Sequence, residues 1–163
     1  MTVKQLATIG VYGFTLEEFL RSLREADVRL VLDVRQRRGV RGPQYAWANS
    51  KRLQAALEEA GIDYQHHPDL APTTDMRQLQ YREDDRLGVG KRSREQLAPE
   101  YRERYTREIL DRADLDAVVA ELPEAGAVAL LCVERDPEAC HRSLIADRLA
   151  AEHQVPVTHL RPS

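Results

Sequence analysis

The stretch around which the chain is organised reads Cys132-Val-Glu134-Arg-Asp136-Pro137-Glu-Ala-Cys140-His141-Arg142-Ser143. An apolar run at 127–133 precedes it, and an amphipathic run at 144–151 follows it. An apolar run that breaks into a polar turn and then a helical pattern is typical of a strand, a loop and a helix in an α/β protein. Ligands of open α/β sheets bind just outside the carboxyl ends of the strands. We therefore expect the functional site at this stretch.

The composition is that of one globular domain. The chain has 163 residues, a length that is enough for one domain with a hydrophobic core and short for two. Of these residues, 42% are apolar and 31% are charged. No apolar run has the length that a bilayer span needs, and the N-terminus carries no signal-peptide pattern. Two cysteines without a secretion signal favour free thiols in a reducing compartment. We expect a cytoplasmic protein with no membrane association.

Alternating patterns across the chain predict an α/β fold. Runs of strand character alternate with runs of helical periodicity, and the predicted strands lie at 6–9, 28–34, 62–66, 127–133 and 155–160. Such alternation implies a mostly parallel, Rossmann-like sheet of about five strands with helices on both faces. Right-handed crossovers place the first strand beside the fourth, which puts a crevice between 10–13 and 134–142. Pro156 favours an edge position for the last strand.

The helices are predicted from capping residues followed by apolar residues at helical spacing. Thr15 and Glu18 form a capping box for a helix over 15–26. We expect a single α/β domain over residues 1–163, interrupted by a charged, partly helical insertion at about 71–107. An insertion of this length is either a lid over the site or a mobile surface excursion.

Four segments carry a resemblance to a known family. They are Thr8-Ile9-Gly10, Asp33-Val34-Arg35, Gly61-Ile62-Asp63-Tyr64 with His66 and Leu70, and the motif that runs from Cys132 to Ala146. Over nearly its whole length the chain resembles the family labelled "domain of unknown function 488". The resemblance implies an α/β fold and a polar pocket around the Cys-His-Arg element, and it implies no particular substrate. The chain departs from many members at Leu70-Ala71-Pro72, where they have Leu-Gly, which puts a glycine-dependent contact there in doubt.

Three residues of the motif are candidates for catalysis, namely Glu134, Cys140 and His141. Asp136-Pro137-Glu138 predicts a helix start, which places Cys140 about one turn into that helix. A lowered pKa of the Cys140 thiol would then come from His141 or Arg142 and would favour a thiolate nucleophile. The alternative is a buried structural cysteine. Glu134, at a strand end, would act as a general base or would orient His141 or Arg142.

Metal binding is the other chemistry open to the thiols. Cys132, Cys140 and His141, together with His66 or His67, have the ligand types of a zinc site. However, the seven residues between the cysteines exceed the usual spacing of structural zinc pairs, and Cys132 lies in an apolar run as a core residue would. We therefore expect no metal and no cofactor, and we keep a Cys/His metal-bearing structural domain as an alternative.

The residues expected to bind a substrate are Gly10, Tyr12, Arg35 and Arg142. Guanidinium groups recognise phosphate or carboxylate through two hydrogen bonds. Gly10 and Gly13 leave backbone amides beside a helix start, which favours an anion. For Arg35 the alternative is an internal salt bridge to Asp33 or Glu134.

A basic loop follows the second predicted strand. It contains arginines and nearby aromatic residues, at Arg35, Arg37, Arg38, Arg41, Tyr45 and Trp47. Phosphate contacts and base stacking use these residue types. The alternative is a solvated arginine loop with Trp47 packed beneath it. The net charge of −3 argues weakly against a dedicated nucleic-acid binder, although a local basic patch can override it.

These patterns favour an enzyme acting on a nucleotide-like or otherwise anionic small molecule at the carboxyl ends of the strands. The first alternative is a non-catalytic nucleic-acid or nucleotide binding module that uses the basic loop 35–41. Steep salt dependence with oligonucleotides would favour that module. The second alternative is the metal-bearing structural domain, which stoichiometric zinc would favour.

Overall fold

The computed structural model describes residues 5–90, 93–123 and 126–162 of the chain. The strands of the sheet are β1 (Gln5–Ile9), β2 (Val28–Asp33), β3 (Asp63–His66), β4 (Ala127–Leu131) and β5 (Val157–Leu160). The helices are α1 (Leu16–Glu25), α2 (Ser50–Glu59), α3 (Thr74–Leu87), α4 (Pro99–Glu108), α5 (Leu115–Ala120) and α6 (His141–His153). None of these described helices is long and apolar enough to span a bilayer.

The five strands form one parallel sheet in the order β3-β2-β4-β1-β5. The predicted five-stranded, Rossmann-like sheet is confirmed, and so is the pairing of the first strand with the fourth. The last strand lies at an edge, as Pro156 indicated, and the Pro156 carbonyl accepts a hydrogen bond from the Leu6 amide (3.0 Å).

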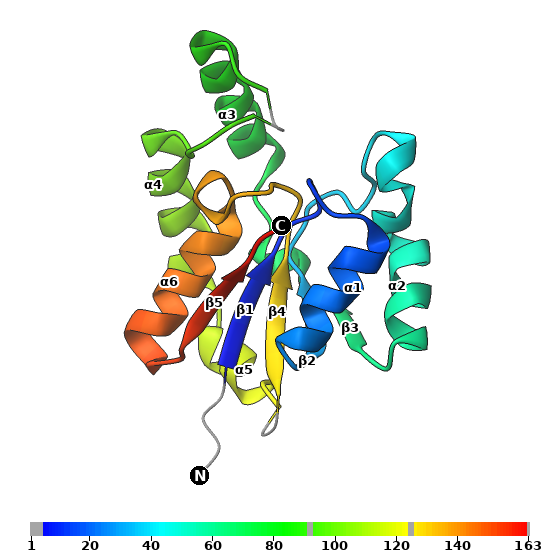
Figure 1. The fold of residues 1–163 in the computed structure, drawn as a ribbon. Coiled ribbons are helices and arrows are strands. Elements are labelled where there is room, and N and C mark those ends of the chain that lie inside the picture. The colour runs from blue at the N-terminus through cyan, green and yellow to red at the C-terminus, as the bar shows by residue number, and fades with distance from the viewer. Residues whose placement is uncertain (1–4, 91–92, 124–125, 163) are drawn as a thin grey trace.

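Helices cover both faces of the sheet. The connection from β1 to β2 and the connection from β4 to β5 run in opposite directions across the sheet. Right-handed crossovers then put α1 and α6 on opposite faces. Figure 1 shows α1 and α2 on one side of the strands, with α4 and α6 on the other. The loops that follow β1 and β4 therefore diverge at a topological switch point, where open α/β sheets bind ligands.

The strand register brings three loops to one place. Ile9, the last residue of β1, pairs with Leu131, the last residue of β4. Asp33, the last residue of β2, pairs with the same Leu131 on its other side. The residues that follow these strands therefore leave the sheet at one level, and their side chains meet above the carboxyl end.

The insertion at about 71–107 is mostly helical and adds buried side chains to the core. Met76, Leu97, Tyr101 and Tyr105 are all buried in the same cluster as the sheet residues. The Tyr105 hydroxyl donates to the Leu70 carbonyl (2.6 Å), which holds α4 against the main domain. In Figure 1, α3 projects beyond the carboxyl ends of the strands. The insertion is thereby placed beside the loop that carries the motif 132–143.

One predicted helix start is wrong. Asp136-Pro137 begins a short 3-10 turn, Pro137–Ala139, and not α6. The backbone then becomes extended at Cys140 (φ −140°, ψ 146°), and α6 begins at His141. Proline fixes a φ that suits both kinds of helix, so its presence could not distinguish a single turn from a longer helix. Cys140 is therefore the N-cap residue of α6 and does not lie one turn inside it.

Candidate functional site

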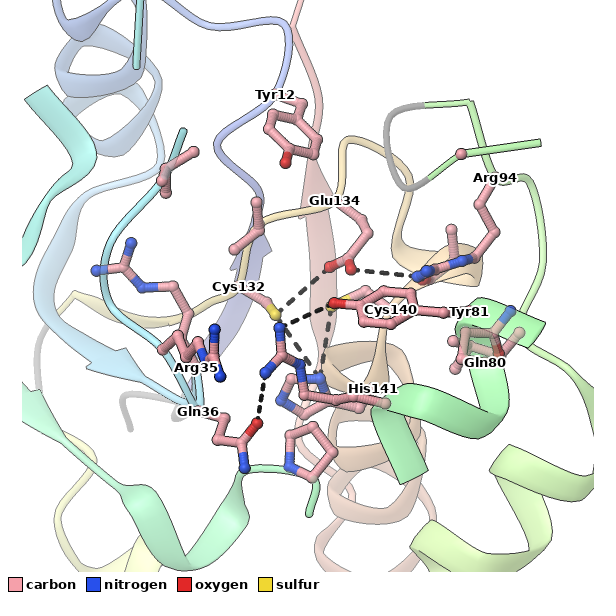
Figure 2. Close-up of a pocket in the computed structure, with 18 of the residues that line it drawn as sticks. Tyr12, Arg35, Gln36, Gln80, Tyr81, Arg94, Cys132, Glu134, Cys140 and His141 are labelled. Carbon is pink, nitrogen blue, oxygen red and sulfur yellow. Dashed lines mark hydrogen bonds and ion pairs between the residues drawn. The ribbon is translucent and has the colours of Figure 1, made fainter. Parts of the chain in front are cut away.

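A cleft of about 670 Å³ opens at the carboxyl end of the sheet. This volume is within the usual range for small-molecule sites. Its walls come from the loops after β1, β2 and β4, from α3 and from the segment before α4. Figure 2 shows these side chains converging on one space. The predicted candidates Tyr12, Arg35, Glu134, Cys140 and His141 all line it, and Cys132 does as well.

Two thiols and an imidazole meet at the base of this cleft. The Cys132 Sγ lies 3.6 Å from the His141 Nδ1, and the Cys140 Sγ lies 3.8 Å from the same nitrogen. Glu134 extends the cluster, because its Oε2 lies 3.5 Å from the Cys132 Sγ. Figure 2 draws these contacts as dashed lines between the labelled side chains. The three predicted catalytic residues therefore lie together with Cys132, which the sequence offered as a core residue or as a metal ligand.

Local structure fixes the imidazole in this position. His141 is the first residue of α6, and its Nε2 donates to the Val34 carbonyl at the end of β2 (2.8 Å). The Tyr105 ring lies against the imidazole, with ring centroids 5.4 Å apart. These contacts leave Nδ1 directed at the two sulfur atoms. The Ser143 hydroxyl donates to the Cys140 carbonyl (2.9 Å) and supports the start of the helix.

The buried thiol and imidazole shift each other's protonation. Burial raises the pKa of the Cys140 thiol, but the hydrogen bond with Cys132 and the charge of His141 outweigh burial and hold this pKa well below its usual value. Burial lowers the pKa of His141, but the negative charge of Cys140 outweighs it and raises this pKa above its usual value. Both shifts act in the direction of a thiolate beside an imidazolium.

Arg94 connects the insertion to this cluster. Its guanidinium forms salt bridges with Asp84 on α3 (2.6 Å) and with Glu134 (3.2 Å), and it donates to the Ala139 carbonyl (3.2 Å). The side chains of Arg94 and Asp84 are each only 4% exposed. Burial of this kind requires a partner for every charge. The network sets the direction of the Glu134 carboxylate, as Figure 2 shows.

The two arginines expected to bind an anion have internal partners. The Arg35 guanidinium forms a salt bridge with Asp33 (2.8 Å) and donates to the Ala48 carbonyl (2.8 Å). This is the internal salt bridge that the sequence offered as the alternative. Arg142 is fully buried and donates to the Glu134 carbonyl (2.6 Å) and to the Arg135 carbonyl (3.2 Å). It shapes the turn of the motif from behind the cleft.

Gly10 has a packing role at the end of β1. A Cβ atom at Gly10 would lie 1.9 Å from the Glu134 carbonyl oxygen, so only glycine allows the two backbones to approach this closely. The amides that follow have internal acceptors: Val11 and Tyr12 donate to the Val133 carbonyl, and Gly13 donates to the Tyr45 hydroxyl. The Tyr12 side chain remains as the part of this loop that lines the cleft.

Arg77 was not recognised from the sequence, and it carries a positive charge into the cleft. Its guanidinium donates to the Gln36 Oε1 (2.7 Å) and to the Tyr81 hydroxyl (2.8 Å). Both of these partners are neutral. Arg37 and Arg41 line the same cleft from the basic loop and are exposed. The guanidinium groups of Arg37, Arg41 and Arg77 thus line the same cleft as the thiols.

Trp47, an aromatic residue that follows the basic loop, is packed toward the core. Trp47 lies against Phe19, with ring centroids 4.9 Å apart, and belongs to the rim of the hydrophobic core. Arg38 donates to the Tyr64 hydroxyl (3.4 Å). This arrangement corresponds to the alternative of an arginine loop with Trp47 beneath it.

Comparison with known proteins identifies one family. The model of the family described as "Domain of unknown function DUF488" matches residues 15–149, which is most of the chain. No curated protein and no solved structure gives a significant match. The match covers all of the residues that line the cleft except Tyr12.

Proposed function

Because the chain belongs to the family "Domain of unknown function DUF488", whose description names no reaction, we propose a function from the cleft itself. The protein is an enzyme that acts on an anionic, nucleotide-like small molecule. One observation carries this proposal: a buried Cys–His–Glu cluster lines a cleft that is also lined by arginines. An enzyme of this kind needs reactive side chains for the chemical step and positive charge to bind the anionic substrate, and the cleft contains both.

Arg77 binds the anionic group of the substrate, together with Arg37 and Arg41. A guanidinium whose hydrogen-bond partners are neutral keeps its charge available for a ligand, and Arg77 donates to an amide oxygen and a hydroxyl. Guanidinium groups bind phosphate oxygens through paired hydrogen bonds. The position of these arginines at the mouth would hold the anionic end of a substrate there and direct the rest of the molecule toward Cys132 and Cys140.

The catalytic residues are Glu134, Cys140 and His141, at the bottom of the cleft. Burying a carboxylate, two thiols and an imidazole costs free energy that hydrophobic residues of similar volume would not cost. Groups of this kind gather at catalytic sites because a water-poor environment strengthens their action on a reacting atom. Glu134, directed by Arg94, is placed to move a proton to or from a substrate in the cleft.

Binding of nucleic acid by the basic loop has less support. Arg35 and Arg38 have internal partners, and Trp47 is packed against Phe19. Sequence-tolerant binding of single strands relies on aromatic faces that are open to the bases. The exposed arginines at 37 and 41 are better explained as the outer part of the cleft.

The experiment compares Arg77→Gln with Arg86→Gln. Both residues lie on α3, but Arg86 pairs with Glu83 on the surface and does not line the cleft. Pyrophosphate and a set of nucleoside mono- and diphosphates are titrated by calorimetry and by thermal shift. A charge-assisted hydrogen bond contributes about 1.5–3 kcal/mol, so Arg77→Gln should weaken binding about tenfold or more. The control should bind as the wild type does. Equal affinities for all three proteins, or no binding by the wild type, would refute the proposal.

A further inference from the structure

The cluster at the base of the cleft has the composition of a metal site. One atom each of Cys132, Cys140 and His141 lies within 4.8 Å of the others, and all three residues are buried. Thiolate sulfur and imidazole nitrogen are the ligands that zinc prefers. All three side chains also line the cleft, so an ion among them would face the substrate space. Figure 2 labels the three side chains close together and marks their contacts with dashed lines.

The distances between the ligand atoms fit a tetrahedral ion. Zinc–sulfur bonds of about 2.3 Å and zinc–nitrogen bonds of about 2.0–2.1 Å imply sulfur–nitrogen separations of about 3.5–3.6 Å at the tetrahedral angle. The separations from Nδ1 are 3.6 Å to the Cys132 Sγ and 3.8 Å to the Cys140 Sγ. Both sulfur–nitrogen separations therefore fit an ion, and the two sulfur atoms lie within 4.8 Å of each other.

The second nitrogen of His141 has the partner that metal-bound histidines use. Its Nε2 donates to the Val34 carbonyl at 2.8 Å. Histidine ligands nearly always donate their other ring N–H to a carboxylate or a backbone carbonyl, which fixes the ring and the tautomer. In this tautomer the Nδ1 lone pair is directed at the sulfur atoms. This contact is an observation independent of the grouping of the three residues.

Charge balance also favours an ion at this place. Two thiolates carry two negative charges, which a divalent cation neutralises. A neutral unit is far easier to bury than separate charges. The wide spacing of the cysteines in the sequence is no obstacle, because the 3-10 turn Pro137–Ala139 returns the chain so that Cys140 faces Cys132.

We propose that Cys132, Cys140 and His141 bind one zinc-class divalent ion whose fourth coordination position opens into the cleft. Structural zinc sites have four protein ligands, whereas catalytic sites have three and leave a position for water. The carboxylate of Glu134 reaches the same cluster, with its Oε2 3.5 Å from the Cys132 Sγ. The inference deepens the enzyme proposed above, and the use of the ion in catalysis rests on that proposal.

The class of reaction that follows is hydrolysis. The ion lowers the pKa of a bound water, and Glu134 accepts the proton that this water releases. The hydroxide oxygen forms a bond to an electrophilic carbon or phosphorus atom of the anionic substrate. The bond from that atom to the leaving group then breaks, and the leaving group takes the proton from Glu134. One water is consumed and no oxidant or reductant is required.

Metal content is the direct test. The full chain is purified without chelators or metal-affinity resin, and its zinc is measured by mass spectrometry before and after titration with zinc. We expect one equivalent per chain. Cys132→Ser and Cys140→Ser should each lower zinc affinity by more than about 100-fold, since even partners behind the ligands contribute about 10–100-fold. His67→Gln is the control, because His67 pairs with Glu121 away from the cluster, and it should keep the full equivalent.

Cobalt substitution gives a second, spectroscopic readout. Cobalt(II) in this site should show thiolate charge-transfer absorption and the intense visible bands of tetrahedral coordination. Glu134→Gln should retain those bands, because Glu134 is not a ligand. Azide should perturb them in the wild type by entering the open position. A protein that binds neither ion, serine variants that bind like the wild type, or cobalt bands indifferent to azide would overturn the proposal.

These outcomes are separable from those of the substrate proposal. Anion binding that depends on Arg77, in a protein that takes up no zinc or cobalt, would remove the metal site and leave the enzyme proposal standing. One equivalent of zinc with no anion binding would support the metal site and remove the substrate class.

Discussion

Replacing Arg94 by methionine should destabilise the protein more than any other single arginine change on the insertion. The substitution removes the guanidinium that neutralises both Asp84 and Glu134, and it leaves their carboxylates buried. Breaking a buried ion pair by removing one partner costs about 3–5 kcal/mol. Asp84→Asn should cost less, about 1–3 kcal/mol, because Arg94 retains Glu134 and the Ala139 carbonyl as partners.

Urea unfolding followed by circular dichroism measures both effects. With a slope of about 2 kcal/mol per molar urea, Arg94→Met should lower the midpoint by about 1.5–2.5 M. The double variant should cost less than the sum of the two single changes, because both remove the same contact. Arg86→Met is the matched control, and its midpoint should not change, since Arg86 is exposed. A loss for Arg94→Met no larger than for the control, or full additivity of the two changes, would refute the reasoning.

Two further substitutions test the packing behind the cleft. Gly10→Ala should cost about 1–3 kcal/mol, because its Cβ would collide with the backbone of Glu134, whereas a Cβ at Gly39 meets only the Asn49 Oδ1 at 3.8 Å. Thermal unfolding of Gly10→Ala and Gly39→Ala measures the difference, and equal melting temperatures would contradict the close approach. Arg142→Ala should also unfold at lower temperature, since it leaves the buried Glu134 carbonyl without its donor, at about 1–3 kcal/mol. A variant with wild-type stability that has lost phosphate binding would instead return Arg142 to the substrate-binding residues.

The fold was largely predictable because its signals are local. The Thr15 hydroxyl accepts from the Glu18 amide as the capping pattern indicated, and α1 begins one residue later. Apolar runs marked the strands, and the rules of crossover handedness then placed β1 beside β4. The start of α6 was missed because Asp136-Pro137 is an equally good beginning for one 3-10 turn, and only tertiary packing decides that the chain straightens at Cys140.

The candidate site was predictable only in part, because many of the residues that line it come from the insertion. Glu134, Cys140 and His141 follow a recognisable strand, so they could be placed at its carboxyl end. Arg77 and Arg94 lie in a segment so rich in charge that no periodicity distinguishes inward from outward residues. The spacing of Gln80 and Asp84 one helical turn apart, on the face that also buries Met76, was the available signal for a buried charge network.

The central position of β4 also determines when the molecule can fold. β1 and β2 do not pair with each other, because β4 lies between them, although it comes about a hundred residues later in the chain. In a ribosome-bound chain that ends before residue 127, β1 and β2 therefore each have one edge whose backbone hydrogen bonds lack the partner strand β4. Unpaired strand edges can pair with other strands or other chains until β4 is synthesised. Insertion of β4 closes the sheet and, in the same event, brings Cys132 and Glu134 into place, so no partly made chain carries the assembled cluster.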